Sequence, residues 1–143
     1  MDKRRWQNAV GIAVAVLFVI GFGLSRVIGG AGTGDGPAAT CDDPVDWQQA
    51  GELDGRATAI VGPVVRASHE PEVGGGPTFL NLGNPHPDPE RFDVVIYQDV
   101  RDRFDRPPED LFDGREICVL GRVRDRDGVP QIILDNPGWI STR

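Results

Sequence analysis

Three arginines at every second position are the pattern in this sequence that most suggests chemistry. Arg122, Arg124 and Arg126 alternate with other residues in the segment GRVRDRDG. Successive side chains of a β-strand point to opposite faces, so this spacing places the three guanidinium groups on one face and Asp125 and Asp127 on the other. A row of guanidinium groups suits the recognition of phosphate or carboxylate. The alternative is a solvated strand face whose arginines pair with nearby acids, and both interpretations are open.

Other reactive side chains form no catalytic pattern. His69 follows a predicted strand and His86 lies among prolines, and neither has a serine or cysteine nucleophile at a recognisable spacing. The neighbouring carboxylates Glu109 and Asp110 belong to a predicted exposed helix, where they favour solubility. Neither a glycine-rich phosphate loop nor a metal-ligand spacing is present. We therefore expect no enzyme activity, no cofactor and no metal.

An apolar run near the N-terminus predicts a membrane anchor. Residues 9–24 contain no charge and no proline, and Trp6 and Arg26 stand where an interfacial aromatic ring and a snorkelling arginine extend a span. Three basic residues precede the run, which keeps the N-terminus in the cytoplasm. We predict a cytoplasmic tail at 1–5 and a transmembrane helix at 6–28, hence a single-pass protein of the cell membrane with an extracytoplasmic domain. A cleaved signal peptide is the alternative.

The two cysteines both follow the predicted anchor. An oxidising compartment favours a disulfide between Cys41 and Cys118. That bridge would enclose about 76 residues and contribute about 4 kcal/mol in the chain-entropy model. Free thiols, a metal site shared with a histidine, and lipidation of Cys41 are the other interpretations.

The rest of the chain divides into a linker, a lead-in segment and a folded domain. Residues 29–40, GGAGTGDGPAAT, have the composition of a flexible linker. Residues 41–55 form a lead-in segment in which Asp46 is predicted to cap a short helical turn. The domain proper is predicted at 56–143.

The outer part of the chain is strongly acidic. The whole chain carries a formal charge of −7 and residues 1–32 carry +3, which leaves −10 for residues 33–143. A domain of this charge repels phosphate backbones at long range, which counts against general nucleic-acid binding.

The domain is predicted to consist of five strands, with one or two short helices between the third and the fourth. Runs rich in β-branched and aromatic residues indicate the strands, and Gly62-Pro63 predicts a bend in the first of them. The strands are expected at 57–67, 78–83 and 91–98 and in a hairpin over 115–134 that turns at Asp127-Gly128, with the helices at 99–114.

The segments GRATAIVGPVV, GPTFLNLG, FDVVIY, DGREICVLGRV and GVPQIIL resemble OB-fold domains of the tRNA-anticodon and helicase type. They are most similar to small membrane-anchored extracytoplasmic OB proteins of bacteria. The resemblance spans residues 56–140. It implies an all-β fold, a five-stranded Greek-key barrel with a short helix between strands three and four.

The resemblance also implies where a ligand would bind. OB barrels bind on the face of strands two and three, between the loop that joins strands one and two and the loop that joins strands four and five. Here the face consists of Phe79, Asn81, Val95 and Tyr97, and the loops are 68–76 and 124–128. Phe79 and Tyr97 offer a stacking platform, unless they pack beneath Trp47 of the lead-in segment or beneath the connector rich in proline.

Two functions follow as expectations. The first is a non-catalytic binding module that recognises a protein or another envelope component, which the acidic charge favours. The alternative is single-stranded nucleic-acid binding through Phe79, Tyr97 and the three arginines, which the resemblance favours. The expected partners are therefore the membrane, a protein or envelope component, and single-stranded nucleic acid.

Overall fold

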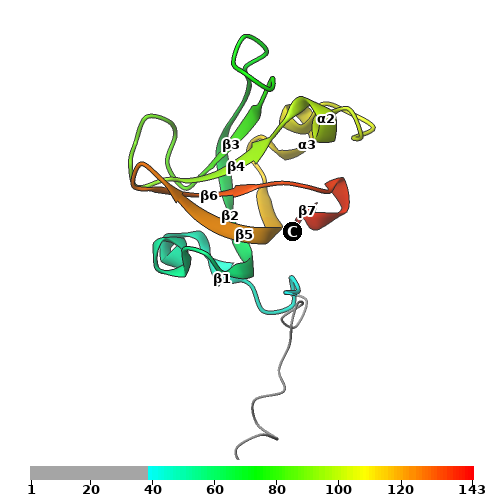
Figure 1. Ribbon diagram of the computed structural model, residues 1–143. Helices are drawn as coiled ribbons and strands as arrows, with labels where there is room; N and C mark the ends of the chain where they lie inside the picture. The colour runs from blue at the N-terminus through cyan, green and yellow to red at the C-terminus, as the bar shows by residue number, and fades with distance from the viewer. Residues whose placement is uncertain (1–38) are drawn as a thin grey trace, which may run out of the picture. The chain divides into compact units, whose positions relative to one another are not determined.

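Five strands close into a barrel in the computed structural model, which describes residues 39–143 (Figure 1). The strands pair in the order β2-β3-β4-β6-β5, and β5 pairs with β2 to close the ring. Within the barrel β4 and β6 are parallel and the other pairs are antiparallel. The barrel strands are β2 (Ala57–His69), β3 (Thr78–Leu82), β4 (Phe92–Ile96), β5 (Glu116–Arg126) and β6 (Val129–Ile133). The predicted strand order and the predicted hairpin are thus confirmed.

The predicted N-terminal elements lie outside this description. They are the cytoplasmic tail at 1–5, the transmembrane helix at 6–28 and most of the linker at 29–40. Within residues 39–143, no helix combines the length and the apolar character that a membrane crossing requires.

Strand β2 bends where the sequence predicts it. Its first half pairs with β5 and its second half with β3, and the pairing register shifts between Val64 and Arg66. The bend follows Gly62 and Pro63, and a proline cannot donate to the strand ladder. One long strand can therefore serve both sides of the closed barrel.

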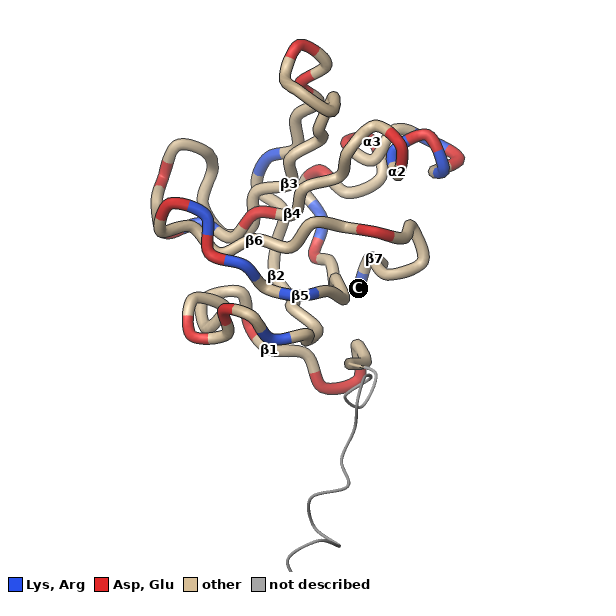
Figure 2. The backbone as a smooth tube through the Cα atoms, viewed as in Figure 1, with Lys and Arg blue, Asp and Glu red and all other residues tan. Residues whose placement is uncertain are grey.

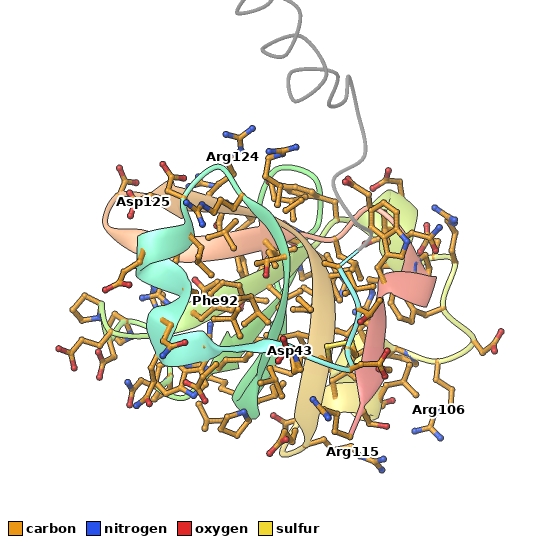
Figure 3. All side chains as sticks on the ribbon, turned by 90° about the horizontal axis from the view of Figure 1, so that it is seen from below. Asp43, Phe92, Arg106, Arg115, Arg124 and Asp125 are labelled. Carbon is orange, nitrogen blue, oxygen red and sulfur yellow. A yellow bond between two sulfur atoms is a disulfide. The ribbon has the colours of Figure 1, made fainter. Side chains whose placement is uncertain are left out.

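Apolar side chains from the inner faces of the strands fill the barrel. Leu80, Leu82, Phe92, Val94 and Ile96 are all fully buried, because alternate residues of β3 and β4 point inward. Figure 3 shows Phe92 inside the barrel.

Two short helices connect β4 to β5, as predicted. Helix α2 (Gln98–Arg101) and helix α3 (Pro108–Phe112) are linked because Arg101 donates two hydrogen bonds to the Glu109 carboxylate. These bonds are the largest cause that lowers the pKa of Glu109 below its ordinary value. Arg101 also donates to the Thr78 hydroxyl at 2.7 Å, which attaches the helices to β3.

The lead-in segment packs against the barrel. Strand β1 (Val45–Asp46) pairs in parallel with β2, and the Asp46 carboxylate caps the 3-10 helix η1 (Trp47–Leu53) by accepting from Gln48 N at 2.9 Å. The Trp47 ring lies against Gly83, where a Cβ would stand 2.1 Å from it. The alternative in which Trp47 covers the predicted ligand face is therefore wrong.

A disulfide and a final strand complete the domain. Cys41 is bonded to Cys118 of β5 with their Cα atoms 6.1 Å apart, so the predicted disulfide is confirmed. After the 3-10 helix η2 (Pro137–Trp139), strand β7 (Ile140–Thr142) pairs with β5.

Candidate binding groove

A groove of about 560 Å³ crosses the outer face of β3 and β4. Its walls come from the loop between β2 and β3, which projects at the top of Figure 1, and from the turn between β5 and β6 at the left. Both loops lie close to their predicted positions, although β2 continues to His69, two residues beyond its expected end, and β5 continues to Arg126, into the loop expected at 124–128.

The strand register arranges the outer side chains in two rows. The first, which we call the polar row, contains successive cross-strand partners on β2, β3, β4, β6 and β5: Arg66, Asn81, Asp93, Gln131 and Arg124. The second, the apolar row, lies two residues further along each strand and contains Ser68, Phe79, Val95 and Ile133. Neighbours within a row are about 5 Å apart and the rows about 7 Å apart, as pleated-sheet geometry requires.

Phe79 and Tyr97 are the aromatic residues of the groove, and both are half-buried. The Tyr97 ring packs against the backbone of Gly75, where a Cβ would stand 2.7 Å from Tyr97 Cδ1. Gly75 has a φ of +82°, and its carbonyl accepts a hydrogen bond from Gln98 N at 2.9 Å. The loop between β2 and β3 therefore supports Tyr97 from one side, while Phe79 contributes to the groove lining.

A polar network holds the floor of the groove. The Asp93 carboxylate accepts from Asn81 Nδ2 at 2.7 Å, and Arg91 Nε lies 3.0 Å from both of its oxygens. His86 N donates to Asn81 Oδ1 at 3.1 Å, which attaches the connector between β3 and β4 to the floor. The charge of Asp93, which is only 5% exposed, is thereby neutralised by Arg91. Within residues 39–143 no group of three or more His, Cys, Asp or Glu side chains could hold a metal ion.

The groove is less acidic than the surface around it. Residues 39–143 contain eleven arginines and twenty carboxylates, a formal charge of −9. The lining contains three of each, which makes it formally neutral: Arg66, Arg91 and Arg126 with Glu70, Asp93 and Asp127. Figure 2 shows acidic residues in the loop at the top and alternating charges at the β5–β6 turn. An anionic ligand would meet less repulsion here than over the domain as a whole.

The predicted ligand residues are brought together only in part. Phe79, Asn81, Tyr97 and Arg126 line the groove. Val95 belongs to the apolar row but is 2% exposed and does not line it, so it supports the floor instead.

The three arginines do not act as one stripe. Arg122 lies where β5 pairs with β2 and donates to the Gly55 carbonyl, whereas Arg124 lies where β5 has turned to pair with β6. Arg124 is exposed at the end of the polar row and points away from the barrel in Figure 3. Asp127 lines the groove together with Arg126, because its φ of +54° interrupts the strand alternation at the turn. The coiling of β5 thus separates arginine side chains that their regular spacing in the sequence had predicted to lie in one row.

The sequence interpretation missed Arg66, Arg91, Asp93 and Gln131 as groove residues. Asp93 alternates with the core residues Phe92 and Val94 of β4, and this alternation is the local signal that could have placed it on the outer face. Gln131 alternates with Ile132 in the same way, but only the pairing of β6 with β4 shows which surface it reaches.

No protein-family model matches the chain, and no curated protein sequence matches it. Among solved structures, the chain is similar to an aspartyl-tRNA synthetase from Entamoeba histolytica, with a TM-score of 0.51 and 10% identity over 77% of this chain and 24% of that one. The chain has an OB-fold. The Stn1-Ten1 complex of S. pombe is also similar, with a TM-score of 0.42 and 17% identity over 62% of this chain and 58% of the other. The chain thus spans about a quarter of the synthetase and less than two thirds of the Stn1-Ten1 chain.

Proposed function

We propose that this protein is a membrane-anchored, extracytoplasmic OB-fold module that binds single-stranded nucleic acid in the groove. The observation that carries the proposal is that Phe79 and Tyr97 line the same groove as Arg66 and Arg126. Neither arginine makes an ion pair with any part of the chain from residue 39 to 143. Aromatic rings flanked by available guanidinium groups are the combination with which OB-folds hold single strands.

The aromatic rings and the arginines would contact different parts of the ligand, the bases and the phosphates. A base can stack on an aromatic ring whatever its identity, and each such contact contributes about 1–3 kcal/mol. Arg66 comes from β2 and Arg126 from the end of β5, so the arginines flank β3 and β4 from opposite sides. A strand lying across the groove would therefore have its phosphates contacted at two points. The similarity to a synthetase whose substrate is an RNA supports the proposal through the shared fold.

The competing function is recognition of a protein or another envelope component in the same groove. The charge of −9 over residues 39–143 favours it. So do two exposed apolar side chains, Val73 in the groove lining at 49% and Ile133 at the end of the apolar row at 39%, because exposed apolar residues are typical of protein-binding surfaces.

A titration at two salt concentrations distinguishes the two functions. The full-length protein, kept in a non-ionic detergent, is titrated with a labelled mixed-sequence 12-mer DNA at 50 and 150 mM salt. Two phosphate contacts give a slope of about −1.4 for log K against log salt, so Kd should rise about fivefold between these concentrations.

Matched variants locate the contacts. Arg66→Gln and Arg126→Gln should each make the slope shallower by about 0.7. Arg115→Gln removes the same charge from an exposed residue that does not line the groove, so it should leave the slope unchanged. An absence of binding at 50 mM salt would refute nucleic-acid binding.

A further inference from the structure

Gln131 is a polar side chain at the groove floor whose amide has no hydrogen-bond partner among residues 39–143. It is 7% exposed, lines the groove and lies in the polar row between Asp93 and Arg124. None of the side-chain hydrogen bonds that bind this floor, such as those of Asn81 and Arg91 to Asp93, includes its amide. Every fully buried side-chain nitrogen and oxygen in residues 39–143 has a partner. The Gln131 amide must therefore reach the surface of the groove.

The amide is the part of the Gln131 side chain that stays open to the groove. The flanking residues of β6 are Ile132 and Pro130, and nine-tenths of Gln131 is already removed from water. The amide itself is at the groove surface, where water can be its partner and a ligand can replace that water. The amide is thus available for a ligand.

Asp93 places a second hydrogen-bond acceptor beside this amide. The two residues are cross-strand partners on β4 and β6, so their side chains start about 5 Å apart on the same face. An ionised carboxylate has about four acceptor positions and no donor, and Asn81 and Arg91 leave part of that capacity unused. The carbonyl of Gln131 and the carboxylate of Asp93 therefore form a pair of adjacent acceptors.

A pair of acceptors fits an amino group, which carries two N–H bonds. Phe79 is the diagonal neighbour of Asp93, and such neighbours lie about 7–8 Å apart, so a base stacked on Phe79 has its edge near the polar row. If the base carries an exocyclic amine, one hydrogen can go to Asp93 and the other to Gln131 Oε1. Gln131 Nε2 can then donate to the adjoining ring nitrogen.

We propose that Asp93 and Gln131 together recognise the exocyclic amine of a bound base, so that the groove prefers cytosine and adenine to uracil and thymine. Uracil and thymine have a carbonyl in place of the amine. Gln131 can turn its amide to donate Nε2 to this oxygen and to accept the ring N–H at Oε1, but the Asp93 carboxylate has no proton to donate, so Asp93 is the residue that disfavours these bases. This inference rests on the proposed function, because it requires that a single strand occupies the groove.

Cytosine and uracil provide the matched test, since they differ only at position 4 and in the proton on N3. The full-length protein in detergent is titrated with labelled dC12 and dU12 at 50 mM salt. We expect dC12 to bind about tenfold more tightly, which is the usual size of such an edge contact. Asp93→Asn keeps the size of the side chain and supplies a donor, so it should reduce the ratio below about twofold. Gln131→Met keeps the length of the side chain and removes the amide, so it should weaken both oligonucleotides.

Arg124→Gln is the control from the same row. It changes a charge without touching the proposed contact, so it should affect both oligonucleotides equally and preserve their ratio. Equal binding of dC12 and dU12 by the wild-type protein refutes the preference and leaves the proposed function intact. A ratio that persists in Asp93→Asn, or full binding by Gln131→Met, likewise refutes this inference alone. If neither oligonucleotide binds, the proposed function and this inference both fail. Thermal unfolding of each variant confirms that the fold is retained.

Discussion

Replacing Phe79 with alanine isolates the stacking contact on which the proposed function depends. Phe79 lies in the middle of the apolar row, between Ser68 on β2 and Val95 on β4, and it is half-buried. One ring can stack with one base, so the variant loses one contact of about 1–3 kcal/mol while Tyr97 remains. This loss corresponds to an increase of Kd by about fivefold to 150-fold. We expect about tenfold, since part of the Phe79 side chain is already covered by protein.

The same substitution should leave the fold intact. Phe79 is not part of the core cluster, whereas its neighbour Leu80 is fully buried within it. A buried leucine replaced by alanine typically costs about 2–5 kcal/mol. Phe79→Ala should therefore cost much less stability than Leu80→Ala, which thermal unfolding of both variants can check.

The assay is fluorescence anisotropy with a labelled 12-mer at 50 mM salt. Two further variants separate stacking from simple apolar contact. Phe79→Tyr keeps the aromatic face and should bind like the wild type, whereas Phe79→Leu keeps an apolar side chain and should be weakened nearly as much as Phe79→Ala. Unchanged affinity in Phe79→Ala would refute a stacking role for this residue, and wild-type affinity in Phe79→Leu would show that the ring face is not what the ligand contacts.

Two predictions concern stability. Cys41 and Cys118 are 77 positions apart in the sequence, so replacing both with serine should lower the free energy of unfolding by about 4 kcal/mol, measured by denaturant titration. A loss below about 1 kcal/mol would contradict the chain-entropy estimate. Arg101 lowers the folded-state pKa of Glu109 below its ordinary 4.5, so the pair stabilises the fold fully above that pH and loses its contribution as the pH falls through the folded value. Glu109→Gln should therefore lower the melting temperature at pH 7 by an amount that shrinks below pH 4.5; a difference that does not depend on pH would exclude the ion pair as its cause.

The elements of the barrel could be predicted because they depend on local patterns. Alternation along β3 and β4 separates Leu80 and Phe92 in the core from Phe79 on the outside. The bend in β2 follows from Gly62-Pro63, since a proline has no amide to donate. These signals act over a few residues, and the closed barrel did not override them.

The groove residues could be predicted only on strands β3 and β4, which follow one another in the sequence. Gln131 and Asp93 are 38 positions apart in the sequence, and they meet because β6 enters the barrel parallel to β4. Nothing local in either segment sets that register. The prediction of a single arginine row on β5 relied on local spacing alone. It was wrong because β5 pairs with β2 at Arg122 and with β6 at Arg124. The spacing of residues determines which face of a strand their side chains occupy, but the closure of the barrel determines which other residues lie next to that face.

The charge distribution indicates how a single strand would be held. The formal charge of −9 over residues 39–143 repels phosphates. At physiological ionic strength the Debye length is about 8 Å, so this repulsion acts only on phosphates close to the surface. Within the groove three arginines balance three carboxylates, so neither strong attraction nor strong repulsion acts there. Affinity must then come mainly from stacking on Phe79 and Tyr97 and from contacts to base edges. A protein that bound mainly through phosphates would have a steep salt dependence and no base preference; for this groove we expect the reverse, a shallow salt dependence together with discrimination between bases.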